Sequence, residues 1–266
     1  MTEPILGGDR FDDKVALVTG SSRNLGAAIA RRFAAHGAAV AVQYQRDAGA
    51  ARLIADEVIA AGGQADCFVA DLAESGAAEG LVEAVQDRFG RVDILVHAAG
   101  PYADLPFVAL DEATWDRVMN VNLRAAYGLA KAAAPGMREQ GWGRMVAISA
   151  GSAFIRTHAV YGLAKDALRH LVASLAIELA PAVTVNAIAP GQIVDTPGVE
   201  EIAPGYMQAQ LEATPLQRLV TWDELSALAV LLCSRPFAMM TGQTLVVDGG
   251  WTLPQGRNTP VIGQAL

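Results

Sequence analysis

The chain has few of the residues from which metal centres and disulfide frameworks are built. It contains two cysteines and four histidines among 266 residues, and the histidines show no metal-ligand spacing. Two cysteines in a chain of this length argue against a disulfide scaffold and fit a reducing compartment. We therefore expect no metal ion in the functional site.

Positive charge and long apolar runs are also scarce. The 20 lysines and arginines, only three of them lysine, are outnumbered by 28 aspartates and glutamates, which gives a net charge of −8 and a pI near 5.0. This balance disfavours nucleic acid and anionic membranes as partners. No run reaches membrane-spanning length, and the first residues lack the basic and apolar regions of a secretion signal. These absences predict a soluble, cytoplasmic protein.

Apolar residues make up 52% of the chain, which is enough for a large core, and charged residues make up only 18%. Short apolar runs typical of buried strands occupy residues 15–19, 39–44, 65–70, 92–97, 144–149, 183–188 and 245–247. Helical spacing occurs at residues 27–36, 50–61, 77–89, 114–139, 160–179 and 222–233. This alternation predicts an α/β fold, one doubly wound Rossmann-type domain over residues 1–266, with a seven-stranded parallel sheet covered by helices on both faces. We expect a substrate lid at residues 200–217 and an irregular tail at residues 254–266.

Glycine and small polar residues lie where the first expected strand passes into the first expected helix. Glycine allows a tight turn there, and the free N–H groups at the start of a helix favour a pyrophosphate. An ordinary strand-to-helix turn also uses glycine and serine, but its place at the first crossover favours a dinucleotide site. The candidate residues are Gly20, Ser22, Arg23, Asn24, Leu25 and Gly26.

The end of the second expected strand indicates which dinucleotide is bound. An acidic residue there would bind the ribose hydroxyls of NAD, whereas the 2′-phosphate of NADP needs cationic donors. The strand ends in Gln45 and Arg46, with no carboxylate before Asp47, and Arg23 lies in the glycine loop. Two arginines favour NADP over NAD, although both could instead be solvated surface residues.

Tyr161 and Lys165 form the main candidate catalytic pair. Residues four apart share a helix face, so the phenol and the ammonium are expected to lie side by side. A free tyrosine has a pKa of roughly 10, and an adjacent cation favours the phenolate, which brings the group into the range of acid–base catalysis. The spacing is also compatible with an amphipathic helix that carries one solvated lysine at its edge.

Seven motifs, in order between about residues 14 and 250, resemble those of the short-chain dehydrogenase/reductase family. They are Thr19-Gly20-x-x-x-Asn24-x-Gly26, Asp71-Leu72, Ala98-Ala99-Gly100, Asn122, Tyr161-x-x-x-Lys165, Pro190-Gly191 and Val247-Asp248-Gly249-Gly250. Within the family the chain is most similar to the group of 3-oxoacyl-acyl-carrier-protein reductases. That group also contains enzymes that act on many other carbonyl substrates.

The resemblance implies a role for each matching residue. Tyr161 would protonate the carbonyl oxygen during reduction, or act as base in the reverse direction, and Lys165 would lower its pKa and bind the nicotinamide ribose. Asn122 would shape its helix and join a water relay to Lys165. The cofactor residues implied are Asp71 with Leu72 at the adenine, Ala98, Ala99 and Gly100 along the cofactor trough, and Pro190, Gly191, Ile193 and Thr196 at the carboxamide.

The chain departs from the family pattern at three places. Asn24 replaces the middle loop glycine, and Ala98, preceded by His97, replaces the usual asparagine after the fourth strand. We expect binding to survive the first change, because asparagine tolerates a positive φ, and we interpret the second as a detail of stability.

The third departure concerns the serine that the family usually places at the end of the fifth strand. Matching the strand puts Ala150 in that slot. Ser152 would face the cleft if side chains alternate regularly, whereas a one-residue bulge would present Ser149. Both serines therefore stay candidate catalytic residues, and both could also be turn serines.

Three further expectations follow from the resemblance. Enoyl-reducing relatives carry their tyrosine seven residues before the lysine, where this chain has His158, so carbonyl chemistry is favoured. The displaced serine leaves open a catalytically inactive dinucleotide-binding protein with a regulatory or structural role. The alanines expected on one face of the helix over residues 114–139, namely Ala125, Ala126, Ala130 and Ala133, would permit close packing between subunits, so we expect a homotetramer. The substrate, a carbonyl compound or an acyl thioester, is not specified.

Overall fold

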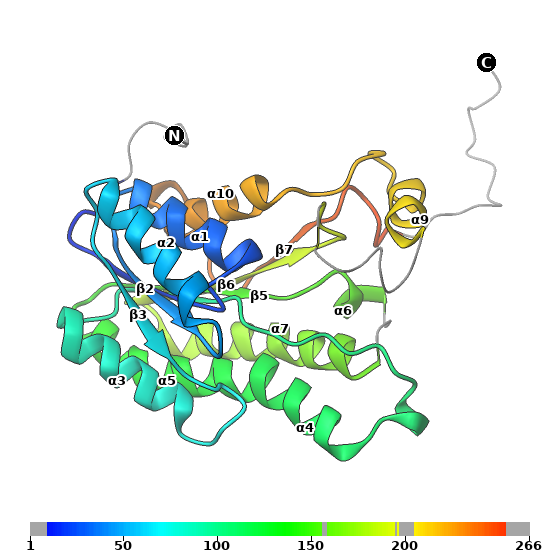
Figure 1. Cartoon of the computed structure of the whole chain (residues 1–266), viewed down its shortest axis with the longest axis horizontal. Helices are drawn as coiled ribbons and strands as arrows, with labels where there is room; N and C mark the ends of the chain where they lie inside the picture. Colours follow the sequence, from blue (N-terminus) through cyan, green and yellow to red (C-terminus); the bar gives the residue numbers. More distant parts are fainter. Residues whose placement is uncertain (1–9, 156–158, 195, 197–204, 254–266) are drawn as a thin grey trace.

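The computed structural model describes residues 10–155, 159–194, 196 and 205–253 (Figure 1). Its centre is one sheet in the order β3-β2-β1-β4-β5-β6-β7, in which every neighbouring pair is parallel. The strands are β1 (Val15–Thr19), β2 (Ala39–Tyr44), β3 (Ala65–Val69), β4 (Ile94–His97), β5 (Gly143–Ile148), β6 (Val183–Pro190) and β7 (Thr244–Val247). The predicted fold class and strand number are confirmed.

Helices cover both faces of this sheet. On one face lie α1 (Asn24–Ala35), α2 (Ala48–Ala60) and α10 (Trp222–Cys233), and on the other lie α3 (Ala77–Phe89), α5 (Ala125–Glu139) and α7 (Ala159–Leu179) (Figure 1). Each set closes its own hydrophobic core against the strands. Parallel strands between two helical layers are buried on both sides, and all five residues of β1 and all six of β5 are buried accordingly.

The helix expected over residues 114–139 is divided in the structure. An α-helix, α4 (Glu112–Met119), passes through one π-helical turn, η2 (Asn120–Arg124), into α5. A π-turn of this kind often marks a functional site. It contains Asn122, so the deviation from the predicted regular helix occurs at a candidate catalytic residue.

Three short elements lie around one end of the molecule, namely η1 (Phe107–Ala109), α6 (Ser152–Ile155) and α9 (Tyr206–Ala213). A fourth, η3 (Arg235–Phe237), follows α10. The expected lid at residues 200–217 corresponds in its described part to α9, whose helix ends before Pro215; residues 200–204 and the expected tail at 254–266 lie outside the described residues. None of the described helices is long and apolar enough to cross a membrane.

The alanine face does not lie where we expected it. All four alanines, Ala125, Ala126, Ala130 and Ala133, are buried within the chain, in the core that α5 forms with α3 and α7. At these positions small side chains let α5 approach its own neighbouring helices closely, and the expected homotetramer stays a prediction.

Candidate active site

The glycine loop joins the centre of the sheet to α1. A Cβ atom on Gly26 would come closer than 3.0 Å to the Gly20 carbonyl group, so only glycine lets the loop pack against the first turn of the helix. Asn24 has a φ of 51°, which confirms that it adopts the left-handed conformation expected from its replacement of a glycine. Arg23, which is exposed, precedes α1.

A buried glutamine that the sequence patterns did not reveal holds this loop. Gln43 on β2 accepts a hydrogen bond from the Gly20 N–H at 2.7 Å through its Oε1 and donates from Nε2 to the Ala70 carbonyl at 2.9 Å. Its backbone also exchanges hydrogen bonds with Ser21. Gln43 therefore fixes the glycine loop relative to the ends of β2 and β3.

The ends of β2 and β3 bring the other cofactor candidates together. Arg46 is exposed next to Gln45, whose Nε2 donates to Asp71 Oδ2 at 2.7 Å. Arg117, which the sequence reasoning did not select, reaches across from α4 and donates to Gln45 Oε1 at 3.1 Å. Asp71 is half-buried, and the next residue, Leu72, is buried.

Tyr161 and Lys165 lie on α7, as their spacing predicted. Lys165 is 3% exposed, its Nζ donates to the Ile148 carbonyl at 2.7 Å, and the same atom lies 5.5 Å from the centroid of the Tyr161 ring. Burial raises the pKa of Tyr161 to about 12 and lowers the pKa of Lys165 to about 7. Lys165 does not produce the expected lowering of the Tyr161 pKa in this structure, because burial of the phenol raises that pKa.

Asn122 and Gly100 meet Lys165 beneath the tyrosine. Asn122 is fully buried, and its Nδ2 donates to the Val118 carbonyl at 2.9 Å and to the Pro101 carbonyl at 3.1 Å. Its Oδ1 has no hydrogen-bond partner among the described residues. A Cβ on Gly100 would lie closer than 3.0 Å to Asn122 Oδ1 and 3.2 Å from Lys165 Nζ. Three of the predicted residues thus converge on one point, where a buried acceptor is left open.

His97 ties this point to the glycine loop, a connection that the sequence reasoning missed. Its Nε2 lies 3.0 Å from the Val121 carbonyl in η2, and its Nδ1 lies 3.0 Å from Thr19 Oγ1 at the end of β1. A carbonyl oxygen only accepts, so Nε2 carries the proton and Nδ1 accepts from the threonine hydroxyl. Burial lowers the pKa of His97 to about 3, which keeps the ring neutral.

The same threonine organises the backbone beyond β4. Thr19 Oγ1 accepts hydrogen bonds from the N–H groups of Ala98 and Ala99, each at 3.1 Å. These two bonds hold the backbone of Ala98 and Ala99 against the end of β1, next to the glycine loop. The signal for this network was the histidine itself, since a buried imidazole requires two hydrogen-bond partners.

The two candidate serines have different environments. Ser149 is 1% exposed, and its hydroxyl donates to the Lys165 carbonyl at 3.0 Å. Ser152, at the start of α6, is 3% exposed, and its Oγ has no partner among the described residues. Ala150, the residue in the family's serine slot, is also buried. Ser149 therefore fastens β5 to α7, whereas the Ser152 hydroxyl is not engaged by any described group.

The loop after β6 carries the remaining candidates. The Gly191 N–H, next to Pro190, donates to the Val247 carbonyl at 3.0 Å, and the Thr196 hydroxyl donates to the Ile193 carbonyl at 2.8 Å. Pro190 is the last residue of β6, and the other three predicted carboxamide residues follow it on the loop beyond the carboxyl end of the sheet. Position 158, used to weigh the enoyl-reducing relatives, lies outside the described residues.

Comparison with known proteins decides the family. A family model described as enoyl-(acyl carrier protein) reductase matches residues 20–252. The chain is 40% identical over 252 residues to an uncharacterized oxidoreductase of Mycobacterium tuberculosis, covering 92% of this chain and 94% of the relative. This chain is a short-chain dehydrogenase/reductase. The resemblance of the seven motifs is thereby confirmed, and the protein is an oxidoreductase.

The names of the relatives of this short-chain dehydrogenase/reductase indicate different substrates. This chain is 35% identical to the 3-oxoacyl-[acyl-carrier-protein] reductase of Pseudomonas aeruginosa, over 89% of this chain and 96% of the relative. Its structure matches a gluconate 5-dehydrogenase from Burkholderia cenocepacia J2315 in complex with NADP and tartrate, with a TM-score of 0.85 and 31% identity over 91% of this chain and 96% of that one. The family therefore does not specify the substrate of this oxidoreductase.

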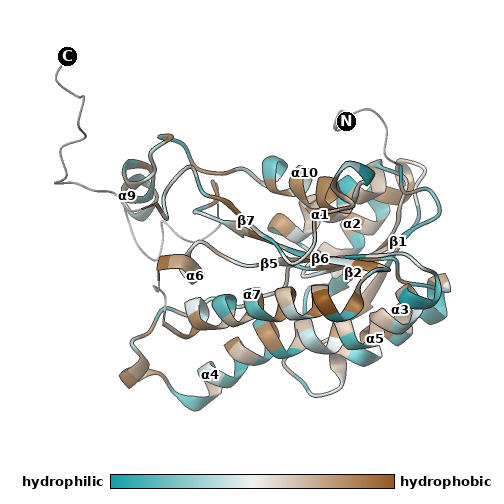
Figure 2. Ribbon diagram, turned by 180° about the vertical axis from the view of Figure 1, so that it is seen from behind, coloured by the Kyte–Doolittle hydropathy of each residue, from teal (hydrophilic) through white to brown (hydrophobic). Residues whose placement is uncertain are grey.

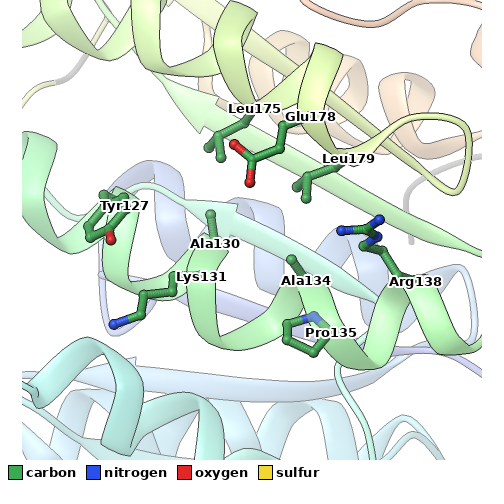
Figure 3. Close-up of a pocket in the computed structure, with 9 residues that line it drawn as sticks. All are labelled: Tyr127, Ala130, Lys131, Ala134, Pro135, Arg138, Leu175, Glu178 and Leu179. Carbon is green, nitrogen blue, oxygen red and sulfur yellow. The ribbon is translucent and has the colours of Figure 1, made fainter.

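A separate groove of about 520 Å³ lies between α5 and the last residues of α7 (Figure 3). Its lining includes Tyr127, Lys131 and Arg138 from α5 and Leu175 and Glu178 from α7.

In the described part of the chain, no group of three or more histidines, cysteines, aspartates or glutamates is placed to hold a metal ion.

Proposed function

We propose that this short-chain dehydrogenase/reductase transfers hydride between NADP(H) and a carbonyl/secondary alcohol pair, with Tyr161 as general acid or base. The observation that carries the proposal is the convergence of Gly100, Asn122 and Lys165 at one point below Tyr161. The glycine loop, which His97 and Thr19 tie to that point, supports a dinucleotide running along the same edge of the sheet.

The residues present fit a nicotinamide dinucleotide. Because Gly26 packs closely against Gly20, no side chain covers the loop, and the N–H groups at the start of α1 are open to a pyrophosphate. We propose that Ser22, Asn24 and Leu25 bind the pyrophosphate with them. Arg23 and Arg46 would hold the 2′-phosphate, and NAD is the second choice. When bound, the nicotinamide supplies or accepts the hydride. The other binding residues we propose are Asp71, Leu72, Ala98, Ala99, Gly100, Tyr161, Lys165, Pro190, Gly191, Ile193 and Thr196.

The tyrosine pKa suits the reducing direction. With a pKa of about 12, the Tyr161 hydroxyl stays protonated at neutral pH and can donate its proton to the developing alkoxide oxygen of the substrate. Oxidation needs the phenolate, which a cation must stabilise, and Lys165 is the cation next to the ring. The open Oδ1 of Asn122 would accept a hydrogen bond from a water molecule that returns a proton towards Lys165.

Of the two serines, we propose Ser152 as the group that binds the substrate oxygen. Its buried hydroxyl has no described partner, and leaving such a group unsatisfied is costly unless a ligand uses it. Ser152→Ala is expected to lower kcat by about 10²-fold, the scale of losing one donor to a developing oxyanion. Ser149→Ala should instead lower the free energy of unfolding by about 1 kcal/mol through loss of its bond to the Lys165 carbonyl. Steady-state kinetics and urea unfolding of both variants measure this, and an enzyme in which neither change lowers kcat works without a serine.

Cofactor preference tests the two arginines. We expect a larger kcat/KM with NADPH than with NADH, and a loss of about 10-fold to 100-fold in that ratio when Arg23 or Arg46 is replaced by alanine, because each would lose a charge-assisted bond to a phosphate. Arg31→Ala, an exposed arginine of α1 that pairs with Glu57, is the matched control. A wild-type preference for NADH would contradict the assignment.

Further proposals concern the whole chain. We propose that residues 1–266 act as one domain, that α9 belongs to a substrate lid, and that the enzyme is a homotetramer. The groove on α5 and α7 supports contact between subunits there, since it combines apolar side chains with charges of both signs, Lys131 and Arg138 against Glu178 (Figure 3).

The proposed reaction is tested by following NADPH at 340 nm with ketones, diketones, β-ketoacyl thioesters and an enoyl thioester. Turnover of a carbonyl compound that depends on the Tyr161 hydroxyl is the expected result. Consumption with the enoyl thioester alone would favour double-bond reduction, to which the family model's description points. Tight binding of NADPH without turnover on the whole panel would favour the inactive dinucleotide-binding alternative.

A further inference from the structure

Exposed apolar side chains are concentrated in one stretch of the chain, the connection from β4 to α4 together with the first turn of α4. Fifteen large apolar or aromatic residues are exposed in the described part, and five of them fall between positions 102 and 115. We refer to these five as the apolar wall; they are Tyr102, Leu105, Phe107, Val108 and Trp115. Scattered exposed apolar residues need no explanation, but a cluster of this kind marks a binding surface.

The apolar wall lies at the end of the molecule where α7 begins, close to Tyr161. The β4–α4 connection projects on the same side as α6 and α9, and hydrophobic colouring marks its tip (Figures 1 and 2). The Phe107 and Trp115 rings pack against each other with centroids 6.4 Å apart. Ala103 and Leu110, at the two ends of the connection, pack with Tyr161 around Val118, Val160 and Ala164. The connection is therefore fixed at its base, next to the tyrosine, while its apolar side chains face outwards.

Tyr102 connects the wall directly to the catalytic tyrosine. Its ring meets the Tyr161 ring edge to face, with centroids 5.1 Å apart and an interplanar angle of 69°. The Tyr102 hydroxyl donates to Asp104 Oδ2 at 3.1 Å, which orients the ring, and 57% of the residue remains exposed. A molecule whose oxygen meets the Tyr161 hydroxyl would extend over Tyr102 and onto the rest of the wall.

The charges of the connection restrict what such a molecule can carry. Residues 101–119 contain four acidic residues, at positions 104, 111, 112 and 116, and one basic residue, Arg117. Arg117 is engaged with Gln45 and Asp71 on the adenine side, away from the wall. A nucleotide or phosphopantetheine carrier lying here would meet a field of its own sign, whereas an uncharged apolar group would not.

We propose that the substrate is an uncharged ketone or secondary alcohol that carries a bulky, ring-containing apolar group, which lies on Tyr102 and the apolar wall. This inference rests on the proposed function, because it assumes that the reacting oxygen meets Tyr161. It separates the enzyme from reductases of sugars, whose hydroxyl groups the wall leaves unsatisfied, and from those of thioesters on anionic carriers.

Two pairs of test compounds examine size and charge separately. The bicyclic ketone α-tetralone is compared with acetoin, and acetoacetyl-N-acetylcysteamine with acetoacetyl-CoA, which has the same reacting carbonyl but a nucleotide tail. We expect kcat/KM to be at least about 10-fold higher for α-tetralone than for acetoin, the scale of apolar discrimination. We expect the uncharged thioester to exceed its CoA counterpart, by a factor that shrinks as salt is added.

Variants then tie the preference to the wall. Leu105→Ser and Phe107→Ser should each raise KM for α-tetralone by about 10-fold and leave acetoin kinetics unchanged. Leu53→Ser, an equally exposed apolar residue on α2, is the matched control and should change neither. Melting temperatures check that the variants are folded.

The outcomes are distinguishable from failure of the proposed function. Tyr161-dependent turnover that favours acetoin or acetoacetyl-CoA, or wall variants that affect both ketones equally, would overturn the proposal while the carbonyl reductase assignment stands. Wall variants with unchanged kinetics but an altered sedimentation coefficient would assign the wall to contact between copies of the chain, and would overturn it too. Absence of turnover with all four compounds and with the wider panel would instead remove the proposed function.

Discussion

Tyr161→Phe is expected to lower kcat by about 10³-fold, a much larger effect than its effect on NADPH binding. The substitution removes the only proton that the tyrosine can donate to the substrate oxygen, and general acid catalysis by a positioned side chain contributes on this scale. Phenylalanine keeps the ring, so the edge-to-face contact with Tyr102 and the packing with Val160 and Ala164 survive. The loss should therefore appear in kcat rather than in stability.

The measurement combines steady-state kinetics with cofactor titration by fluorescence. Tyr127→Phe, which removes an exposed hydroxyl on α5 away from the site, is the matched control and should behave as the wild type. A Tyr161→Phe enzyme that retains more than about a tenth of the wild-type kcat would show that another group or water delivers the proton.

Gly100→Ala is expected to lower kcat by about 10²-fold and the free energy of unfolding by about 1–3 kcal/mol. The added methyl group would enter the space between Asn122 Oδ1 and Lys165 Nζ. The backbone here cannot move aside cheaply, because Thr19 holds the N–H groups of Ala98 and Ala99. Asn122 or Lys165 must therefore shift, and a displacement of about 1 Å in a catalytic group costs roughly this factor in rate.

Gly80→Ala is the matched control for this substitution. Gly80 lies within α3, and a Cβ there would meet nothing within 4 Å. The same chemical change should raise the free energy of unfolding by up to about 1 kcal/mol, since alanine favours a helix over glycine, and leave kcat unchanged. Urea unfolding and steady-state kinetics measure both variants. A Gly100→Ala enzyme with wild-type kcat would mean that Asn122 and Lys165 do not need their observed positions.

The fold could be predicted from sequence because parallel strands buried on both faces appear as continuous apolar runs. The strands at residues 15–19 and 39–44 and the helices at 77–89 and 222–233 have the predicted bounds, and the other bounds moved by a few residues. The π-turn at Asn120–Arg124 could not be predicted in this way. It depends on hydrogen bonds that reach the Val118 and Val121 carbonyls from side chains, one of them His97 on a distant strand.

The candidate site shows the same division between local and long-range information. Helical spacing placed Tyr161 beside Lys165, but the directions of their pKa changes followed from burial of both side chains, which depends on elements distant in the sequence. Strand alternation could not separate Ser149 from Ser152, because their difference is a bond from Ser149 to the Lys165 carbonyl on another element. Arg117 and Gln43 were missed since neither belongs to a motif.

The imidazole of His97 also determines how the site responds to mild acidification. A group whose pKa is about 3 gains no proton at any pH that a cytosol or an acidifying vesicle reaches. The bonds that join the ends of β1 and β4 to the π-turn therefore do not titrate with a histidine's usual sensitivity. The neutral imidazole of His97 therefore keeps both of its hydrogen bonds at mildly acidic pH.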